Sequence, residues 1–219
     1  MFKAMQAVPL FPTMVWTHDL KPEDYEPMNK RLLAEIDAML SPRPPLQMGQ
    51  TWQTDQRLHD LETFAPLVAF IETATNGVLD YLEVDHEGFE ITGCWANVNP
   101  PGAPHSPHTH PNNYLSGVYY VQTAAGADSI SFYDPRPMTN VISPNFKKPN
   151  GHNLTRLEVR VPPGRLVIFP AWFQHGVGAN MSNQERVSIS FDIMLNAFTE
   201  KYSKPKWEGL PVGGQQKRS

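Results

Sequence analysis

Two segments in the second half of the sequence alternate between apolar and polar residues with a period of two. In residues 186–193 one set of alternate positions is apolar, and the other set begins with Arg186 and Ser188. In residues 114–121 the same period puts Ser116 and Tyr120 on one side of the chain. This alternation is typical of β-strands that bury one face, so it predicts a sheet with an apolar face under helices and a polar face lining a cavity.

The rest of the chain divides into helices followed by strands. Residues 24–40 and 64–82 carry apolar side chains at helical spacing and predict two amphipathic helices. The predicted strands are residues 89–99, 114–121, 129–133, 155–161, 165–169 and 186–195. This order predicts an α+β fold that is mostly β.

The length of 219 residues is compatible with one domain, residues 1–219. Within it we expect an N-terminal strand and supporting helices in residues 1–88, the β core in residues 89–196 and a C-terminal tail in residues 197–219. Residues 136–154 are rich in Pro and Asn and have little periodicity, so they are predicted to form a lid or insertion near the functional site.

Charge and hydropathy disfavour several classes of partner. The formal net charge of −4 argues against a bulk nucleic-acid footprint, and no apolar run approaches the roughly 18 residues of a membrane-spanning helix. Cys94 is the single cysteine, and the N-terminus lacks a signal-peptide pattern. We therefore expect a cytoplasmic protein without a membrane partner.

Three histidines are placed as possible ligands of one metal ion. His108 and His110 are two residues apart, so their side chains project from the same side of an extended segment. His175 follows an apolar run and a Pro-containing turn, and it precedes the strand that carries Arg186. His105 would face the opposite side of a strand from His108, so we expect it in a loop or behind the ligands. The predicted metal site is His108, His110 and His175.

These motifs resemble those of the 2-oxoglutarate- and iron(II)-dependent oxygenases, over roughly residues 95–193. His108-Thr-His110-Pro111 and Ser116-Gly-Val-Tyr-Tyr120 are similar to the His-x-His-Pro and Ser-Gly-x-Tyr-Tyr signature of bacterial and phage members. The resemblance implies a double-stranded β-helix, or cupin-like jelly roll, with the N-terminal helices packed on one sheet. It also implies Fe(II) as the metal, 2-oxoglutarate as cosubstrate and hydroxylation of a substrate with release of succinate.

The resemblance further implies roles for individual residues. His108 and His175 look like the two histidine ligands, and Arg186 with Ser188 looks like the Arg-x-Ser pair that binds the distal carboxylate of 2-oxoglutarate. Tyr120 is similar to a tyrosine that hydrogen-bonds that carboxylate in prolyl hydroxylases. Two further candidates for the cosubstrate site are Ser116 and Asn97.

One position departs from the superfamily's pattern. The usual ligand set is two histidines and one carboxylate, in a His-x-Asp/Glu motif followed by a later His, and His110 stands at the acidic position. No Asp or Glu occurs in residues 91–127, so the set is three histidines, two histidines with water, or two histidines with a distant acid such as Asp134. We favour three histidines, because Asp134 precedes Pro135 and suits a turn. Three neutral imidazoles leave the metal at a formal charge of +2, and a bound 2-oxoglutarate dianion then gives a neutral complex.

Other interpretations of the same residues stay open. Tyr120, Ser116 and Asn97 could be packing residues, and Arg186 could form a surface ion pair. A cupin-type dioxygenase or isomerase would bind its substrate directly to the metal and would not need Arg186, and a non-catalytic metal-binding protein would release no succinate. The substrate, a small molecule or a peptide, and the oligomeric state are not determined by the sequence, and the ligand types alone also allow zinc or nickel.

Overall fold

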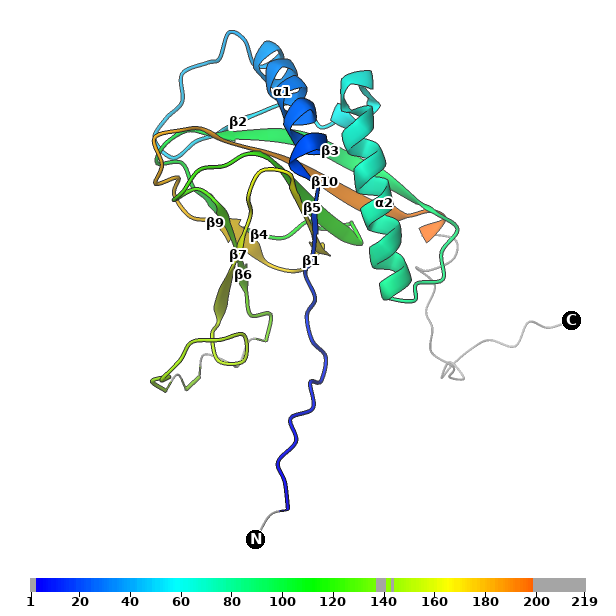
Figure 1. Ribbon diagram of the computed structural model, residues 1–219, viewed down its shortest axis with the longest axis vertical. Coiled ribbons are helices and arrows are strands. Elements are labelled where there is room, and N and C mark those ends of the chain that lie inside the picture. The colour runs from blue at the N-terminus through cyan, green and yellow to red at the C-terminus, as the bar shows by residue number, and fades with distance from the viewer. Residues whose placement is uncertain (1–2, 137–140, 143, 199–219) are drawn as a thin grey trace, which may run out of the picture.

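The computed structural model describes residues 3–136, 141–142 and 144–198, and in this part of the chain two antiparallel β-sheets face each other (Figure 1). The larger sheet has the strand order β1 (Trp16–Asp19), β8 (Arg165–Pro170), β5 (Leu115–Gln122), β10 (Arg186–Leu195), β3 (Phe89–Asn99) and β2 (Trp52–Gln53). The smaller sheet has the order β4 (His105–His108), β9 (His175–Val177), β6 (Ser129–Tyr133) and β7 (Arg156–Arg160).

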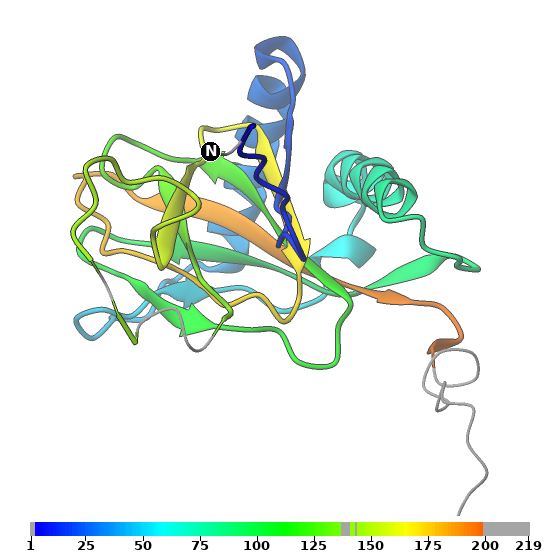
Figure 2. The same ribbon diagram turned by 90° about the horizontal axis from the view of Figure 1, so that it is seen from below.

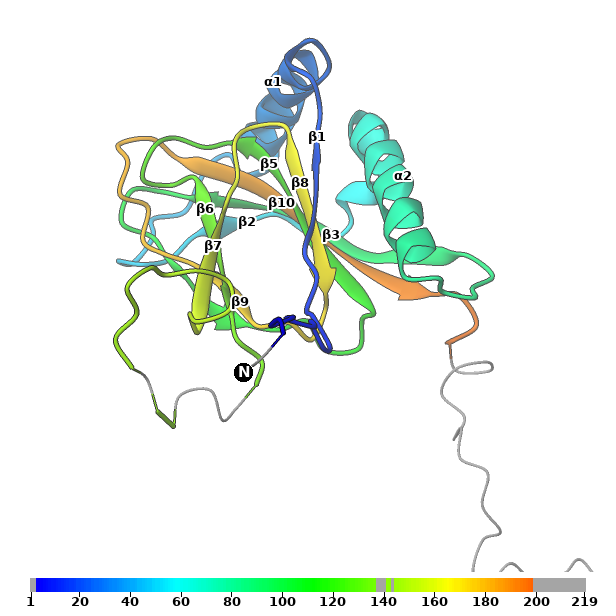
Figure 3. The ribbon, with the colours of Figure 1, turned by 60° about the horizontal axis from the view of Figure 1, so that its bottom comes forward.

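The chain passes back and forth between these sheets, as expected for a jelly roll. It runs from β3 to β4, back to β5, across to β6 and β7, and then through β8 and β9 to β10. Figure 3 shows β6, β7 and β9 lying opposite β5, β8 and β10. The predicted α+β, mostly β jelly roll is confirmed, although backbone pairing among the described strands does not join the two sheets into a closed barrel.

The predicted strands match the observed ones closely. The predicted bounds are those of β3, β6 and β10, and they differ by one residue at the ends of β5, β7 and β8. The alternating pattern does not predict β2, β4 and β9, which contain only two to four residues each. The predicted tail lies outside the described residues beyond residue 198.

Both helices cover the outer face of the six-stranded sheet (Figures 1 and 2). Helix α1 (Pro22–Met39) begins with a proline and carries Glu23 and Asp24 in its first turn, where acidic groups are favourable to the helix dipole. Helix α2 (Ala65–Tyr81) follows the short 3-10 helices η1 (Leu58–Asp60) and η2 (Glu62–Phe64). The side chains that the two long helices bury include Met28, Leu32, Ile36, Leu67, Ile71 and Val78.

The period of two in β5 and β10 separates two apolar clusters. Tyr119 and Ile189 pack under the helices, whereas Val118 and Tyr120 lie between the two sheets. Gly117 belongs to this packing, because a Cβ there would lie only 2.2 Å from the Phe191 ring. The sheet therefore presents one apolar face to the helices and a mixed face to the interior, as the alternation predicts.

A buried polar link joins α1 to β5. The Nδ2 of Asn29 donates a 2.8 Å hydrogen bond to the backbone oxygen of Val121, and the Tyr119 hydroxyl donates a 2.7 Å bond to Asn29 Oδ1. Asn29 is only 6% exposed, so these bonds satisfy groups that water does not reach. They fix where the helix sits along the strand.

No helix in the described part of the chain combines the length and apolar content that crossing a bilayer requires.

Candidate metal and cosubstrate site

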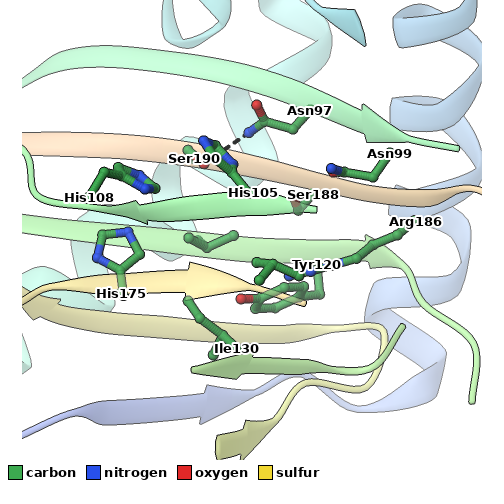
Figure 4. Close-up of a pocket in the computed structure, with 12 residues that line it drawn as sticks. Asn97, Asn99, His105, His108, Tyr120, Ile130, His175, Arg186, Ser188 and Ser190 are labelled. Atoms are coloured by element: carbon green, nitrogen blue, oxygen red, sulfur yellow. Dashed lines mark hydrogen bonds between the residues drawn. The ribbon is translucent and has the colours of Figure 1, made fainter. Parts of the chain in front are cut away.

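A cavity between the two sheets contains most of the predicted site residues. Both sheets line it, and its walls carry Asn97, Asn99, His105, His108, Val118, Tyr120, Ile130, His175, Val177, Arg186, Ser188 and Ser190. Figure 4 shows His108 and His175 at one end of this cavity and Arg186 at the other. The cavity therefore has an imidazole end and a guanidinium end.

At the imidazole end, three histidines converge. One potential ligand atom from each of His108, His110 and His175 lies within 4.8 Å of the other two. His108 ends β4, His110 follows that strand by two residues, and His175 begins β9. Asp134, the distant acid considered above, is not part of this group and pairs with Arg136 at 2.7 Å.

Two of the rings are oriented by backbone carbonyls. His108 Nδ1 lies 2.8 Å from Ser106 O, and His175 Nδ1 lies 2.9 Å from Phe173 O. A carbonyl oxygen only accepts, so in both rings Nδ1 carries the proton and Nε2 keeps its lone pair. This is the tautomer that allows Nε2 to bind a metal ion.

Burial keeps these rings uncharged. Burial lowers the pKa of His175 to about 3, against the weaker opposing effect of its bond to Phe173 O. Burial likewise lowers the pKa of His108. Both imidazoles are therefore neutral at pH 7, which is the form that coordinates metals.

His110 is held differently from the other two. Its backbone N–H donates a 2.9 Å bond to Ala171 O, and its ring stacks on Trp95 with a centroid distance of 5.9 Å. The His110 ring also stacks on His175, with a centroid distance of 5.2 Å. Its Nδ1 lies 2.9 Å from Asp192 Oδ1, and both side chains are about nine-tenths buried. A carboxylate thus occupies the place that a carbonyl takes beside the other two rings.

His105 corrects one expectation from the sequence. It lies on β4 and shares the cavity with His108, with the two rings stacked at 4.5 Å, so the prediction that it faces away was wrong. The pairing of β4 with β9 is irregular between these residues, because Pro107 has no N–H to donate to the ladder. The irregularity brings both rings to one side. His105 is nevertheless outside the group of three.

At the guanidinium end, several buried donors lack partners. Arg186 is 2% exposed, and its Nε and Nη1 have no hydrogen-bond partner among the described residues. Among the same residues, Asn99 Nδ2 also has no partner, and the Tyr120 hydroxyl has none of good geometry, although the nearby Arg186 interacts with it. The Arg186 guanidinium lies 5.2 Å from the Tyr120 ring centroid. Burial raises the pKa of Tyr120 to about 12 despite the nearby guanidinium, so its hydroxyl stays protonated.

The remaining candidates divide into two groups. Ser188 and Asn97 line the cavity, and Asn97 donates from Nδ2 to Ser190 Oγ at 3.0 Å. Ser116 is buried but does not line the cavity, and its Oγ donates a 3.3 Å bond to Phe191 O. The structure therefore places Ser188 and Asn97, but not Ser116, where a cosubstrate could reach them.

The residues of this cavity fit a divalent metal and a dicarboxylate. Neutral imidazoles are good ligands for first-row transition metals. An unpaired buried guanidinium is costly, and a carboxylate would satisfy its forked donors. Tyr120 and Asn99 add two more unpaired donors for the oxygens of such a group.

Residues 93–192 match the model of the family described as "Putative 2OG-Fe(II) oxygenase". The match covers 100 of the 219 residues, and we refer to these residues as the oxygenase domain after the family whose model they match. No protein among those with curated functions matches the sequence.

Most of the chain also has the fold of solved 2-oxoglutarate-dependent enzymes. The 2-oxoglutarate-dependent epimerase SnoN from nogalamycin biosynthesis superposes with a TM-score of 0.60 at 16% identity, over 92% of this chain and 91% of that one. A Pseudomonas putida prolyl-4-hydroxylase superposes with a TM-score of 0.57 at 14% identity, over 83% of this chain and 92% of that one. HygX of Streptomyces hygroscopicus, with nickel and 2-oxoglutarate bound, superposes with a TM-score of 0.58 at 12% identity, over 85% of this chain and 84% of that one. At these identities the similarity establishes the fold.

Sequence reasoning did not assign roles to three residues of the site. Asn99 is two positions beyond Asn97 on β3, and Asp192 is on the same face of β10 as Arg186, so the period of two was a usable signal for both. For His105 the period of two gave no such signal, because Pro107 indicates an irregular strand but not the side to which the ring then points.

Proposed function

We propose that the oxygenase domain binds Fe(II) through His108, His110 and His175, anchors 2-oxoglutarate through Arg186, and hydroxylates a small-molecule or peptide substrate. The observation that carries this proposal is the buried guanidinium of Arg186, which lies at the opposite end of the cavity from the histidines and whose Nε and Nη1 have no hydrogen-bond partner among the described residues. Solved structures of the same fold, SnoN with Fe3+ and alpha ketoglutarate and HygX with nickel and 2-oxoglutarate, support the pairing of metal and cosubstrate.

Each group of the chain has a defined task in this proposal. His108 and His175 present Nε2 because their Nδ1 atoms are held by carbonyls. Arg186, with Tyr120 and Ser188 beside it, holds the distal carboxylate. Bound iron and 2-oxoglutarate would supply the oxidation itself, in which dioxygen is consumed, 2-oxoglutarate loses carbon dioxide to become succinate, and a hydroxyl group is added to the substrate.

Aromatic side chains limit the access of water to the metal ligands. The Phe169 ring lies 4.4 Å from His175, and Phe132 lies 6.1 Å from it, measured between centroids. An apolar wall on this side keeps His175 neutral and its orientation fixed.

A cupin-type dioxygenase or isomerase is the alternative with the same fold. Such an enzyme binds its substrate directly to the metal, so no carboxylate of a cosubstrate would then compensate the buried charge of Arg186. The desolvated guanidinium therefore favours the 2-oxoglutarate enzyme. We also propose a cytoplasmic location without membrane or bulk nucleic-acid partners, which the net charge of −4 and the single, buried Cys94 support.

Anaerobic addition of iron(II) and then 2-oxoglutarate tests the function. We expect a visible metal-to-ligand charge-transfer band, because the 2-oxo acid chelates the iron. The band should be lost at the same concentrations in His175→Ala and Arg186→Ala. Arg160→Ala is the matched control, since Arg160 is exposed and pairs with Asp128, and it should keep the band. Iron binding without any band would favour the cupin-type enzyme.

The same titration examines the third ligand. His110→Asp should retain the metal because a carboxylate can replace the imidazole, whereas His110→Ala should bind it more weakly. Equal affinity in both variants and in the unchanged protein would remove His110 from the ligand set.

A further inference from the structure

Asp192 is a buried carboxylate that the proposed chemistry has not used. It lies on β10 and is 8% exposed, and its Oδ1 has no aligned hydrogen-bond donor among the described residues. The pairing of β10 with β3 shifts register directly after it, between Asp192 and Ile193. Irregularities of this kind redirect side chains in sheets. A buried carboxylate with a free oxygen calls for a compensating group nearby.

His110 is the ionisable group beside it. Its Nδ1 lies 2.9 Å from Asp192 Oδ1, a distance that suits a charge-assisted hydrogen bond once the ring turns into line. The ring stacks on both Trp95 and His175, and these neighbours restrict how far it can turn. Hydrogen bonds in the active sites of unliganded enzymes are often poorly aligned and tighten once the site is occupied.

The three proposed ligands then follow one rule. An acceptor faces Nδ1 in each ring: Ser106 O for His108, Phe173 O for His175 and Asp192 Oδ1 for His110. In each case Nε2 is left for the metal. The third acceptor differs from the others in carrying a negative charge.

We propose that Asp192 is a positioning residue that orients His110 for the metal. Its carboxylate, hydrogen-bonded to His110 rather than bound to the metal, also supplies the negative charge that the three-histidine ligand set lacks. The usual two-histidine, one-carboxylate set gives a formal charge of +2 − 1 = +1 on the metal with its ligands. Three imidazoles give +2, and Asp192 behind His110 brings the local sum back to +1. A carboxylate behind a metal-bound histidine also makes that imidazole a stronger ligand.

Nickel(II) titration of the metal-free protein tests the inference. Asp192→Ala should weaken nickel affinity about 10- to 100-fold. Asp192→Asn should lose less, because its amide oxygen can still accept from Nδ1 while the charge is gone, and it serves if the alanine variant does not fold. Asp19→Asn is the matched control. It removes a strand carboxylate that pairs with Arg165 and touches none of the three histidines, so it should bind nickel normally.

A double-mutant cycle separates positioning from general stability. With His110→Ala already present, either change at Asp192 should alter nickel affinity less than about twofold, because its effect acts through that ring. An unchanged affinity in Asp192→Ala, or the same loss with and without His110, would overturn the inference.

The inference rests on the proposed function, but the two fail differently. Nickel affinity that depends on both Asp192 and His110, without a charge-transfer band from iron and 2-oxoglutarate, would leave Asp192 in its role and reject the oxygenase site. A charge-transfer band in the unchanged protein, together with a nickel affinity that does not depend on Asp192, would support the oxygenase site and reject the role of Asp192. Nickel affinity that is indifferent to His110 would reject both the third ligand and its carboxylate.

Discussion

Burial of individual histidines at the site keeps their side chains in the neutral protonation state. His105 and His175 are buried beside other imidazoles, and burial lowers the pKa of His105 to about 4 and that of His175 to about 3. The neutral form needed for metal binding is thus present well below pH 7. Protonating either ring in the folded protein would place a charge in a poorly solvated site.

The metal-free protein should lose stability as the pH falls from about 6.5, the ordinary histidine pKa that both residues regain on unfolding. Below that pH the unfolded chain binds more protons than the folded one. The stabilisation is therefore complete above pH 6.5 and is lost as the pH falls towards the folded pKa values. Each histidine contributes at most about 1.4 kcal/mol per pH unit to the free energy of unfolding.

Urea unfolding at about pH 7.5 and about pH 5 measures this effect. Carboxylates also titrate in this range, so the comparison is with His175→Gln, which should show a smaller fall between the two pH values. An equal fall in this variant would mean that His175 is not the group responsible.

At the scale of elements, the contact between β4 and β9 decides where His108 lies. Gly176 makes the close approach possible, because a Cβ there would lie 2.9 Å from His105 O and 3.1 Å from Pro107 Cα. Backbone atoms cannot move aside as a flexible side chain would. The spacing between the two short strands therefore depends on this glycine.

Gly176→Ala should destabilise the fold by about 1–3 kcal/mol and weaken nickel binding, because β4 must shift and carries His108 with it. Gly178→Ala is the control, since its Cβ would meet no atom within 4 Å. Chemical denaturation and nickel titration of the two variants test this. Matching results for both would show that the strand spacing tolerates a methyl group.

The sequence predicts long elements better than short ones. β3, β5 and β10 have eight or more residues, so a period of two is visible in them. The strands β4 and β9 have four and three residues and hold His108 and His175, yet such lengths show no periodicity. The convergence of the histidines was predictable from their positions around those strands. The side to which His105 points was not, because it depends on the irregular pairing beside Pro107.

Across the whole molecule, the proposed site draws on both sheets. The four-stranded sheet supplies His108 and His175, whereas the six-stranded sheet supplies Tyr120, Arg186 and Ser188. A metal ion with 2-oxoglutarate would thus connect two sheets that are not joined by strand pairing in the part of the chain that the structure describes. Ligands that bind only the folded state stabilise it.

Removing metal and cosubstrate should accordingly lower the melting temperature. Nickel with 2-oxoglutarate at 100 times the dissociation constant should raise the free energy of unfolding by about 2.7 kcal/mol. For a chain of this size this corresponds to a rise in melting temperature of roughly 5–11 °C. Scanning calorimetry with and without a chelator measures the difference. In Arg186→Ala, nickel should still raise the melting temperature, and 2-oxoglutarate should add little. A full response to 2-oxoglutarate in that variant would place its anchor elsewhere.

The bond between Asn29 and β5 extends the reach of the site to the outer layer of the molecule. Tyr119, which bonds Asn29, and Tyr120, which faces the cavity, are consecutive residues that point in opposite directions. If α1 shifted by even one residue, two buried polar groups would lose their hydrogen-bond partners. The helix therefore stabilises the position of the strand whose other face lines the proposed cosubstrate site. A substitution that shifts α1 from its solvent-exposed side should therefore change the affinity of the protein for 2-oxoglutarate.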